Sequence, residues 1–496
     1  MSKEDYYQKK LEALADKDFR IFERPELIKN PKQFHIVGVC GTAMGALAGL
    51  LCEKGFKVSG SDQVCYPPIS TMLEGLDVQT HFGNFEVKNI GDADVIVIGN
   101  VARPQNPEAQ FARENKLVQT TLPEVLREYI FEDALRIVVA GTHGKTTTTG
   151  LIAEIFETAG AHPGFMIGGV PQGKEHGFAL GAGEFAIFEG DEYDTSYFNK
   201  MPKFLQYGAH TGIVTSIELD HLDIYSDLND YRRAFEFFVK EIPEDGFLFV
   251  NGDKDETRSL SLSSKSHVMT YGLSENNDIF ARNLKKENGM QTFDFMYHGA
   301  SLGQIETSLS GNHNVANILA AVGVALAHGL SFEFIKKGVK NFKGMKRRQE
   351  IVGDINGVLL IDDFAHHPTA VRETLLGIKQ KYSDKRIVAL FEPRSNSSRK
   401  KVFEKDYINS FDNADLVFIK VPPFREGDVV EDFMDANFVA QSVSEKGIPM
   451  QVAENVDDLV KKVLPEIREG DLIIMMSNGA FDGLQAKLLD KLKQKS

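Results

Sequence analysis

The residues most clearly suited to a chemical role form a glycine-bounded loop near position 144. Its pattern is shorter than the common phosphate-binding pattern G-x-x-x-x-G-K-[ST], but it has the same parts between an apolar strand and a helix. Backbone N–H groups of such a loop face phosphate oxygens, and the start of the helix adds positive charge. The alternative interpretation is a glycine-rich turn that is capped by threonines. The loop consists of Gly141, Thr142, His143, Gly144, Lys145, Thr146 and Thr147.

Two groups of acidic residues follow strands further along the chain. Packed carboxylates repel one another unless a cation or hydrogen-bond donors compensate, and Mg²⁺ is the expected cation beside a phosphate loop. Either group alone would be consistent with a solvated acidic turn, and a lone histidine with a structural role. Two such strand ends after one phosphate loop favour a metal–phosphate site. The first group comprises Glu189, Asp191, Glu192 and Asp194, and the second comprises Glu218, Asp220, His221 and Asp223.

A second glycine-rich turn opens the first part of the chain. Its glycines are out of register with the dinucleotide pattern G-x-G-x-x-G, because Cys40 stands where the second glycine would be. Asp62 follows the next strand, at the position where an acid that binds ribose is expected. The turn is consistent both with nucleotide binding and with a plain structural turn.

Three α/β units position these residues. We expect them at residues 33–130, 131–345 and 346–496, after a charged, helix-prone N-terminal extension at residues 1–32. In each unit, apolar strands alternate with helical patterns, which predicts parallel sheets with helices on both faces. Ligands bind at the carboxyl ends of the strands in such sheets.

Length and composition are consistent with this organisation. A chain of 496 residues with 42% hydrophobic and 26% charged residues indicates a globular protein of two to four domains. The formal net charge of −15 argues against a nucleic-acid-binding surface, and no apolar run is long enough to span a membrane. Three cysteines match neither a disulfide framework nor a metal-binding spacing, so we expect the protein to reside in a reducing cytoplasm.

Together these stretches resemble the Mur ligases, over residues 34–489 and in the order that the family shows. The resemblance implies a three-domain α/β architecture: a Rossmann-like N-terminal domain, a P-loop ATPase central domain and a Rossmann-like C-terminal domain. Ser216 departs from the asparagine that the family often has, and Phe235 stands where other members carry a carbamylated lysine. The matching stretches are residues 141–147, 189–194, 215–223, 311–317, 347–348 and 362–369.

The resemblance also implies roles for individual residues. Lys145, Glu189, His221 and Arg348 are the expected catalytic residues, and Thr146, Glu189 and His221 would hold metal. Asn314 and Asn317 would face adenine, Asp363 the ribose of ATP, and Arg348 its phosphates. The UDP-sugar site would comprise Gly38, Gly41, Thr42, Asp62 and Asn100. The peptide site would comprise His366, Arg394, Ser395, Asn396, Ser477 and Asn478, although His366 could instead cap a turn.

Within the family, the resemblance is to the branch that joins L-Ala-γ-D-Glu-meso-diaminopimelate to UDP-N-acetylmuramate in peptidoglycan recycling. It implies that ATP and Mg²⁺ convert the muramyl carboxylate to an acyl phosphate, which the peptide amine attacks; Cys40 would then serve packing. The deciding stretches are residues 38–45, 66–68, 163–171, 392–397 and 476–479. The alternatives are the biosynthetic ligase that adds L-alanine, a non-catalytic nucleotide-sugar sensor and a folylpolyglutamate-like ligase. No oligomeric state is predicted.

Overall fold

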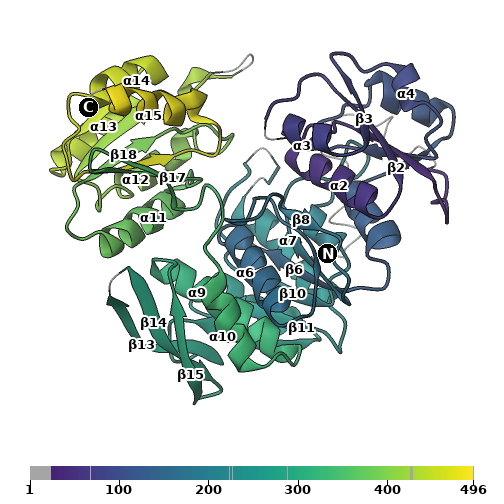
Figure 1. Cartoon of the computed structure of the whole chain (residues 1–496), viewed down its shortest axis with the longest axis horizontal. Coiled ribbons are helices and arrows are strands. Elements are labelled where there is room, and N and C mark those ends of the chain that lie inside the picture. Colours follow the sequence, from purple (N-terminus) through teal and green to yellow (C-terminus); the bar gives the residue numbers. More distant parts are fainter. Residues whose placement is uncertain are drawn as a thin grey trace.

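The computed structural model describes residues 24–494, except residues 68, 223, 226, 288 and 425–427. Most of the expected N-terminal extension, residues 1–23, and Asp223 of the second acidic group lie outside the described residues. Within the described ranges, no helix is both long and apolar enough to cross a membrane. Figure 1 shows three lobes, with the N-terminal domain at the upper right, the C-terminal domain at the upper left and the central domain below them.

The N-terminal domain is built on a parallel sheet. Its described strands have the order β3-β2-β1-β4-β5. The expected succession of strand, glycine-rich turn, helix and strand is confirmed by β1, α2 and β2. The strands are β1 (Gln33–Val37), β2 (Lys57–Asp62), β3 (Val78–Phe82), β4 (Val95–Ile98) and β5 (Val118–Thr120). The main helices are α2 (Thr42–Glu53), α3 (Ile69–Gly75), α4 (Pro107–Glu114) and α5 (Leu122–Val125).

The central domain contains a ten-stranded sheet among the residues described, in the order β15-β14-β13-β12-β11-β10-β6-β9-β7-β8. Its parallel part comprises β6 (Leu135–Ala140), β7 (Gly164–Met166), β9 (Phe185–Glu189), β10 (Thr211–Val214), β11 (Phe247–Asn251) and β12 (His267–Gly272). The antiparallel pairings, which the sequence pattern did not predict, involve β8 (Phe178–Ala179), β13 (Ile279–Glu287), β14 (Met290–Tyr297) and β15 (Ala300–Thr307). The helices include α6 (Lys145–Thr158), α7 (Leu228–Glu241), α8 (Asp255–Arg258), α9 (Asn312–Ala327) and α10 (Phe332–Asn341).

The C-terminal domain has a mixed sheet whose described strands run in the order β16-β17-β21-β18-β19-β20. Only β16 pairs antiparallel among these six strands. The strands are β16 (Glu350–Ile355), β17 (Val358–Asp363), β18 (Ile387–Phe391), β19 (Leu416–Lys420), β20 (Met450–Ala453) and β21 (Leu472–Met476). The helices are α11 (Pro368–Lys381), α12 (Glu404–Ile408), α13 (Ala436–Glu445), α14 (Val456–Val463) and α15 (Leu484–Gln494).

The N-terminal and central domains share a hydrophobic core, whereas the C-terminal domain has cores of its own. One continuous cluster of buried residues runs from Phe34 and Leu47 in the N-terminal domain to Phe188 and Phe235 in the central domain. The C-terminal domain buries its apolar residues in two clusters of its own. Because apolar burial is the main stabilising term in domain packing, the N-terminal and central domains form the firmer pair.

Cys40 and Cys65 form a disulfide, which corrects the expectation that the cysteines match no disulfide framework. Their Cα atoms lie 5.3 Å apart, although 25 positions separate them in the chain. Cys40 follows β1 and Cys65 follows β2, and these strands pair in parallel. The carboxyl ends of adjacent parallel strands meet at one edge, so the fold brings together residues whose linear spacing carries no signal.

A buried pair of side chains, Glu108 on α4 and His35 on β1, links this helix to the N-terminal sheet. The Glu108 carboxylate lies 3.2 Å from His35 Nε2, and neither side chain is exposed. Asn89 Nδ2 and the backbone N–H of Glu86 donate to the other Glu108 oxygen, at 2.8 and 3.1 Å. Burial alone would raise the pKa of Glu108, but the hydrogen bonds from His35, Ser61 and Asn89 lower it.

We expect Glu108→Ala to lower the free energy of unfolding of the region that contains this pair by about 3–5 kcal/mol, because it leaves buried donors without their acceptor. Urea denaturation followed by circular dichroism measures the change. The control is Glu114→Ala, which removes an exposed carboxylate that accepts from Gln110 at 2.7 Å. That variant should stay within roughly 0.5 kcal/mol of the parent. Equal effects of the two substitutions would contradict the stabilising role of Glu108.

Candidate active site

The phosphate-loop candidate connects β6 to α6. Gly141 and Gly144 have φ angles of 132° and 82°, a region that side chains rarely adopt. A Cβ atom at Gly141 would lie 2.2 Å from Thr215 Oγ1, and one at Gly144 would lie 2.5 Å from Asn317 Oδ1. Both positions therefore require glycine for the backbone conformation and for the close approach of neighbours.

Lys145, the first residue of α6, turns back over the loop. Its Nζ donates to the Gly141 carbonyl at 2.6 Å and to the Thr142 carbonyl at 3.2 Å. It also lies 2.6 Å from Glu192 Oε1. Burial disfavours the charged ammonium, but the carboxylates of Glu192 and Glu189 raise the pKa of Lys145, so it stays cationic. The charge stands at the mouth of the loop, where an anionic phosphate would be stabilised.

A second group of polar side chains meets beside the loop. Thr146 Oγ1 donates to Glu189 Oε1 at 2.7 Å, and Arg348 Nη2 approaches the same hydroxyl at 3.3 Å. The backbone N–H of Gly168 donates to the other Glu189 oxygen at 2.6 Å. The structure thus brings together three of the residues expected in the metal–phosphate site. A hydroxyl and a carboxylate are hard oxygen donors, which match Mg²⁺.

His221 faces Glu192, a residue to which the sequence assigned no individual role. His221 Nε2 lies 3.8 Å from Glu192 Oε2, and its ring lies 4.4 Å from the Tyr193 ring. Its backbone has a φ of 53°, and its N–H donates to Ser397 Oγ of the C-terminal domain at 2.9 Å. Glu192 therefore connects Lys145 to His221. The sequence signal that could have identified Glu192 was its position after β9 in the first acidic group.

The two departures from the family pattern have structural explanations. Ser216 Oγ accepts from the His143 backbone N–H at 2.9 Å, so a serine orders the phosphate loop at this position. Phe235 is fully buried, and its ring stacks on Phe204 at a centroid distance of 5.0 Å. An apolar side chain in this setting supplies packing and no metal ligand.

The residues expected to face adenine lie at the start of α9. Asn314 Nδ2 donates to the Ser310 carbonyl at 2.7 Å, and Asn317 Nδ2 donates to Asn314 Oδ1 at 3.2 Å. Asn317 also abuts Gly144, so this helix start lies directly against the phosphate loop. Both side chains are buried, which gives them fixed orientations.

The linker into the C-terminal domain carries Arg347, Arg348 and Gln349. The positive φ angles of 59° at Arg347 and 51° at Gln349 turn the chain sharply there. Asp363 accepts from the backbone N–H groups of Gln349 at 2.8 Å and Ala365 at 2.7 Å. Burial raises the pKa of Asp363, although the nearby Arg348 opposes this. In this arrangement the Asp363 carboxylate anchors the linker, in addition to any contact with ribose.

The residues expected in the UDP-sugar site lie along one edge of the N-terminal sheet. Gly38 and Gly41 belong to the turn after β1, and Thr42 begins α2. Asp62 ends β2 and accepts from the Cys40 backbone N–H at 2.9 Å, which fixes the turn. Asn100 is exposed just after β4. Because β1 pairs with both β2 and β4, these carboxyl ends form the switch point at which open α/β sheets bind nucleotides.

The expected peptide-site residues separate into inward and outward groups. Ser477 is buried, and its hydroxyl donates to Glu392 Oε2 at 2.6 Å, so it acts within the domain. The His366 Nδ1 atom lies 3.0 Å from the Phe364 carbonyl, and burial lowers the pKa of His366 to about 4. Ser395 and Ser398 exchange hydrogen bonds that order the preceding turn. Arg394, Asn396 and Asn478 are partly exposed.

Three charged residues around Arg394, namely Glu392, Lys420 and Asp482, were not predicted from the sequence. Lys420 Nζ lies 2.7 Å from Glu392 Oε1 and also pairs with Asp482. Arg394 Nη1 lies 3.9 Å from the same Asp482. Lys420 ends β19 and Glu392 follows β18, so only the pairing of these strands places them together. The group is a charge-balanced network at the carboxyl edge of the sheet, in which Lys420 is buried and Arg394 is partly exposed.

A phosphate loop, a hydroxyl–carboxylate pair beside it and an arginine that reaches this pair from the linker to a third domain are the parts expected of an ATP-dependent ligase. The chain matches the family descriptions "Mur ligase family, catalytic domain" over residues 33–131, "Mur ligase middle domain" over residues 139–325 and "Mur ligase, glutamate ligase domain" over residues 347–479. These matches cover more than half of the chain. It belongs to the Mur ligase family.

Relatives from two branches of the family resemble the whole chain. It is 35% identical over 467 residues to the UDP-N-acetylmuramate–L-alanyl-γ-D-glutamyl-meso-2,6-diaminoheptandioate ligase of Haemophilus influenzae, covering 94% of this chain and all of the relative. It is 34% identical over 451 residues to the UDP-N-acetylmuramate–L-alanine ligase of Desulfosudis oleivorans, covering 90% and 96%. The crystal structure of a murein peptide ligase from Psychrobacter arcticus matches with a TM-score of 0.70 and 31% identity, covering 93% and 99%.

Proposed function

We propose that this chain joins L-Ala-γ-D-Glu-meso-diaminopimelate to the carboxylate of UDP-N-acetylmuramate, with ATP as the energy source, in peptidoglycan recycling. The observation that carries the proposal is the convergence of Lys145, Thr146, Glu189 and Arg348 at the phosphate loop. The relatives that match over 94% of the chain support the tripeptide as the amine substrate. ATP and nucleotide sugars are cytoplasmic metabolites, so the proposed location is the cytoplasm.

The reaction proceeds in two transfers. The muramyl carboxylate attacks the γ-phosphate of ATP, which forms an acyl phosphate and releases ADP. The peptide amine then attacks the acyl carbon, which forms the amide and releases inorganic phosphate and a proton. Lys145 and Arg348 stabilise the charge that develops on the transferred phosphoryl group, because fixed cations in a partly buried site act strongly on such charge.

Mg²⁺ is the proposed metal, held by Thr146 and Glu189, with His221 as the expected further ligand. The oxygen donors of Thr146 and Glu189 lie 2.7 Å apart, and they match the preference of this ion. When bound, Mg²⁺ supplies positive charge that neutralises the phosphates. Glu192 keeps Lys145 in place beside them, and it also faces His221 at 3.8 Å.

Arg394 is the proposed contact for a carboxylate of the peptide. It offers a planar donor group suited to a carboxylate, whereas Lys420 is buried and paired with Glu392 and Asp482. The peptide carries carboxylates on its γ-linked glutamate and diaminopimelate residues, whereas L-alanine offers one. The partly exposed Arg394 guanidinium therefore suits the amine substrate that carries more carboxylates.

The decisive experiment is a phosphate-release assay with UDP-N-acetylmuramate, ATP and Mg²⁺. One reaction receives L-Ala-γ-D-Glu-meso-diaminopimelate as the amine, and a parallel reaction receives L-alanine. We expect turnover with the tripeptide and at most a trace with L-alanine. Turnover with L-alanine alone would replace the proposal by the biosynthetic reaction. Absence of turnover with both amines would overturn the proposed activity.

We expect Arg394→Ala to raise the KM for the tripeptide by about tenfold or more while the KM for UDP-N-acetylmuramate stays unchanged. The loss of a bidentate, charge-assisted contact with a carboxylate is the reason. Steady-state kinetics with each substrate varied in turn measures both constants. Arg372→Ala is the control, since Arg372 lies on α11 and pairs with its neighbour Glu373 at 3.6 Å. A selective rise in the KM for the UDP-sugar would contradict the role of Arg394.

A further inference from the structure

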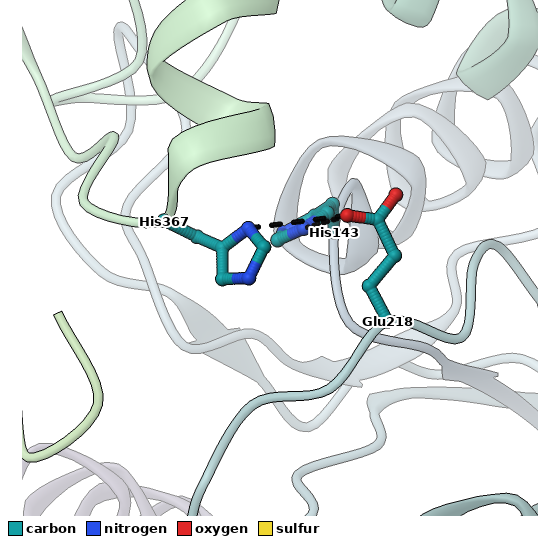
Figure 2. A group of neighbouring side chains, drawn as sticks. All are labelled: His143, Glu218 and His367. Atoms are coloured by element: carbon teal, nitrogen blue, oxygen red, sulfur yellow. Dashed lines mark ion pairs between the residues drawn. The ribbon is translucent and has the colours of Figure 1, made fainter. Parts of the chain in front are cut away.

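Three side chains from separate segments converge at the boundary between the central and C-terminal domains (Figure 2). His143 belongs to the phosphate loop, Glu218 follows β10, and His367 immediately precedes α11. His143 Nε2 lies 3.4 Å from Glu218 Oε2, and His367 Nδ1 lies 3.9 Å from the same oxygen. Figure 2 shows both imidazoles directed at this one carboxylate.

Hydrogen bonding leaves this group incompletely satisfied. His143 Nε2 is buried and has no hydrogen-bond partner among the described residues. His367 Nδ1 accepts a long bond of 3.3 Å from the Thr369 backbone N–H. Thr369 Oγ1 donates to Glu218 Oε2 at 2.6 Å, which orients the carboxylate and leaves it further accepting capacity. A buried ring nitrogen without a hydrogen bond is costly, so a ligand at His143 Nε2 would stabilise the arrangement.

The protonation states suit metal ligation. Burial and the neighbouring His143 lower the pKa of His367 to about 4, so this imidazole is neutral at neutral pH. Burial would raise the pKa of Glu218, but His143 and Thr369 lower it to about 2, so the carboxylate is ionised. The His143 and His367 rings lie 4.7 Å apart between centroids, a spacing that disfavours two charged rings.

We propose that His143, Glu218 and His367 form a binding site for a first-row transition metal ion of the Zn²⁺ type, separate from the proposed Mg²⁺ site. Two imidazoles and one carboxylate with an open fourth position are a recurring ligand set for Zn²⁺. The three donor atoms lie within 4.8 Å of one another. Metal bonds of about 2.0–2.2 Å need donors roughly 3.4 Å apart in a tetrahedral site, so movements of about 1 Å complete it.

The chemistry of the donors distinguishes the two metals. Mg²⁺ prefers oxygen ligands in octahedral geometry, as the Thr146 and Glu189 side chains provide. Imidazole nitrogens favour Zn²⁺, Co²⁺ and Ni²⁺ over Mg²⁺. His143 remains partly exposed, with 23% of its side chain accessible, although its Nε2 atom is buried.

The position of the site gives metal binding a mechanical effect. His143 and Glu218 belong to the central domain, and His367 belongs to the C-terminal domain. The domains otherwise bury their apolar residues largely in separate clusters, so a shared ion would fasten the C-terminal domain against the phosphate loop. On the proposed function, this fastening predicts inhibition of turnover by Zn²⁺, but metal binding itself is tested without catalysis.

The test uses the full chain, stripped of metal by a chelator and assayed without nucleotide or Mg²⁺. Co²⁺ is titrated first, because its visible absorption intensifies when imidazoles replace water in a site of low coordination number. Zn²⁺ is then added to displace Co²⁺ and to give an affinity. We expect a Co²⁺ band in the parent chain and a loss of Zn²⁺ affinity of about tenfold or more in His367→Gln and in Glu218→Gln.

The controls separate this site from its neighbours. His366→Gln removes the adjacent histidine, whose Nδ1 faces the Phe364 carbonyl at 3.0 Å, and it should bind Zn²⁺ as the parent does. His221→Gln removes the histidine of the proposed Mg²⁺ site and should also retain the Co²⁺ band. Thermal melts of the metal-free variants verify folding, and Glu218→Gln serves if His367→Gln proves unstable. A parent chain without a Co²⁺ band, or unchanged Zn²⁺ affinity in both cluster variants, would overturn the proposal.

Discussion

Lys145→Ala is expected to lower turnover by at least about 10²–10³-fold, the scale seen when a fixed stabiliser of transition-state charge is removed. Lys145 is the cation at the loop mouth, held there by two carbonyl oxygens and by Glu192. Its removal takes away the positive charge that stabilises the negative charge developing on the phosphoryl group. Water cannot replace a preorganised ammonium. ADP release in the presence of all three substrates is the measurement.

Two further variants make this expectation specific. Lys174→Ala removes a lysine that lies 3.9 Å from Glu154 on the partly exposed side of α6, and it should turn over as the parent does. Lys145→Met retains most of the side-chain volume without the charge, and it should be as inactive as Lys145→Ala. Both substitutions leave the Glu192 carboxylate without Lys145 as its partner. A thermal melt of each variant therefore verifies that the domain remains folded. Substantial turnover in a folded Lys145 variant would refute the role of the ammonium.

Glu189→Gln is expected to lower turnover by about 10²-fold and to raise the half-saturating Mg²⁺ concentration by about tenfold. The amide keeps the shape of the side chain but loses its charge and one of its two acceptor oxygens. Those oxygens accept from Thr146 at 2.7 Å and from the Gly168 backbone at 2.6 Å. A Mg²⁺ titration of phosphate release gives both quantities.

The matched control for this substitution is Glu184→Gln, which changes an exposed carboxylate just before β9. It alters the net charge by the same amount, so it accounts for general electrostatic effects on Mg²⁺ binding. The control should leave the Mg²⁺ titration unchanged. A Glu189→Gln titration that coincides with the control would mean that another residue holds the metal.

The arrangement of the cores indicates which domain moves during the reaction. The N-terminal and central domains share a continuous apolar cluster, whereas the C-terminal domain meets the central domain mainly through polar contacts such as Thr369 with Glu218. Polar contacts exchange with water at small cost, but separating a shared core exposes apolar surface. Opening and closing of the active site is therefore expected to be a movement of the C-terminal domain on the linker at residues 347–349.

The local elements that carry the chemistry follow from the amino-acid sequence. The glycines and the lysine of the phosphate loop, flanked by β6 and α6, were predictable because strand periodicity, turn residues and helix starts are encoded within a short window. The parallel strands ending in acidic or glycine-containing stretches followed for the same reason. The antiparallel extension by β13, β14 and β15 was not predicted, because strand patterns do not state the direction of pairing.

Which side chains meet depends on the tertiary structure. Glu192 faces both Lys145 and His221 because β9 and β10 flank β6 in the central sheet. Cys40 meets Cys65 because β1 pairs with β2, although linear spacing indicated no disulfide. His367 joins His143 and Glu218 only through docking of the C-terminal domain. These contacts depend on strand order and on the packing of distant surfaces, and neither is encoded by the residues adjacent in the chain.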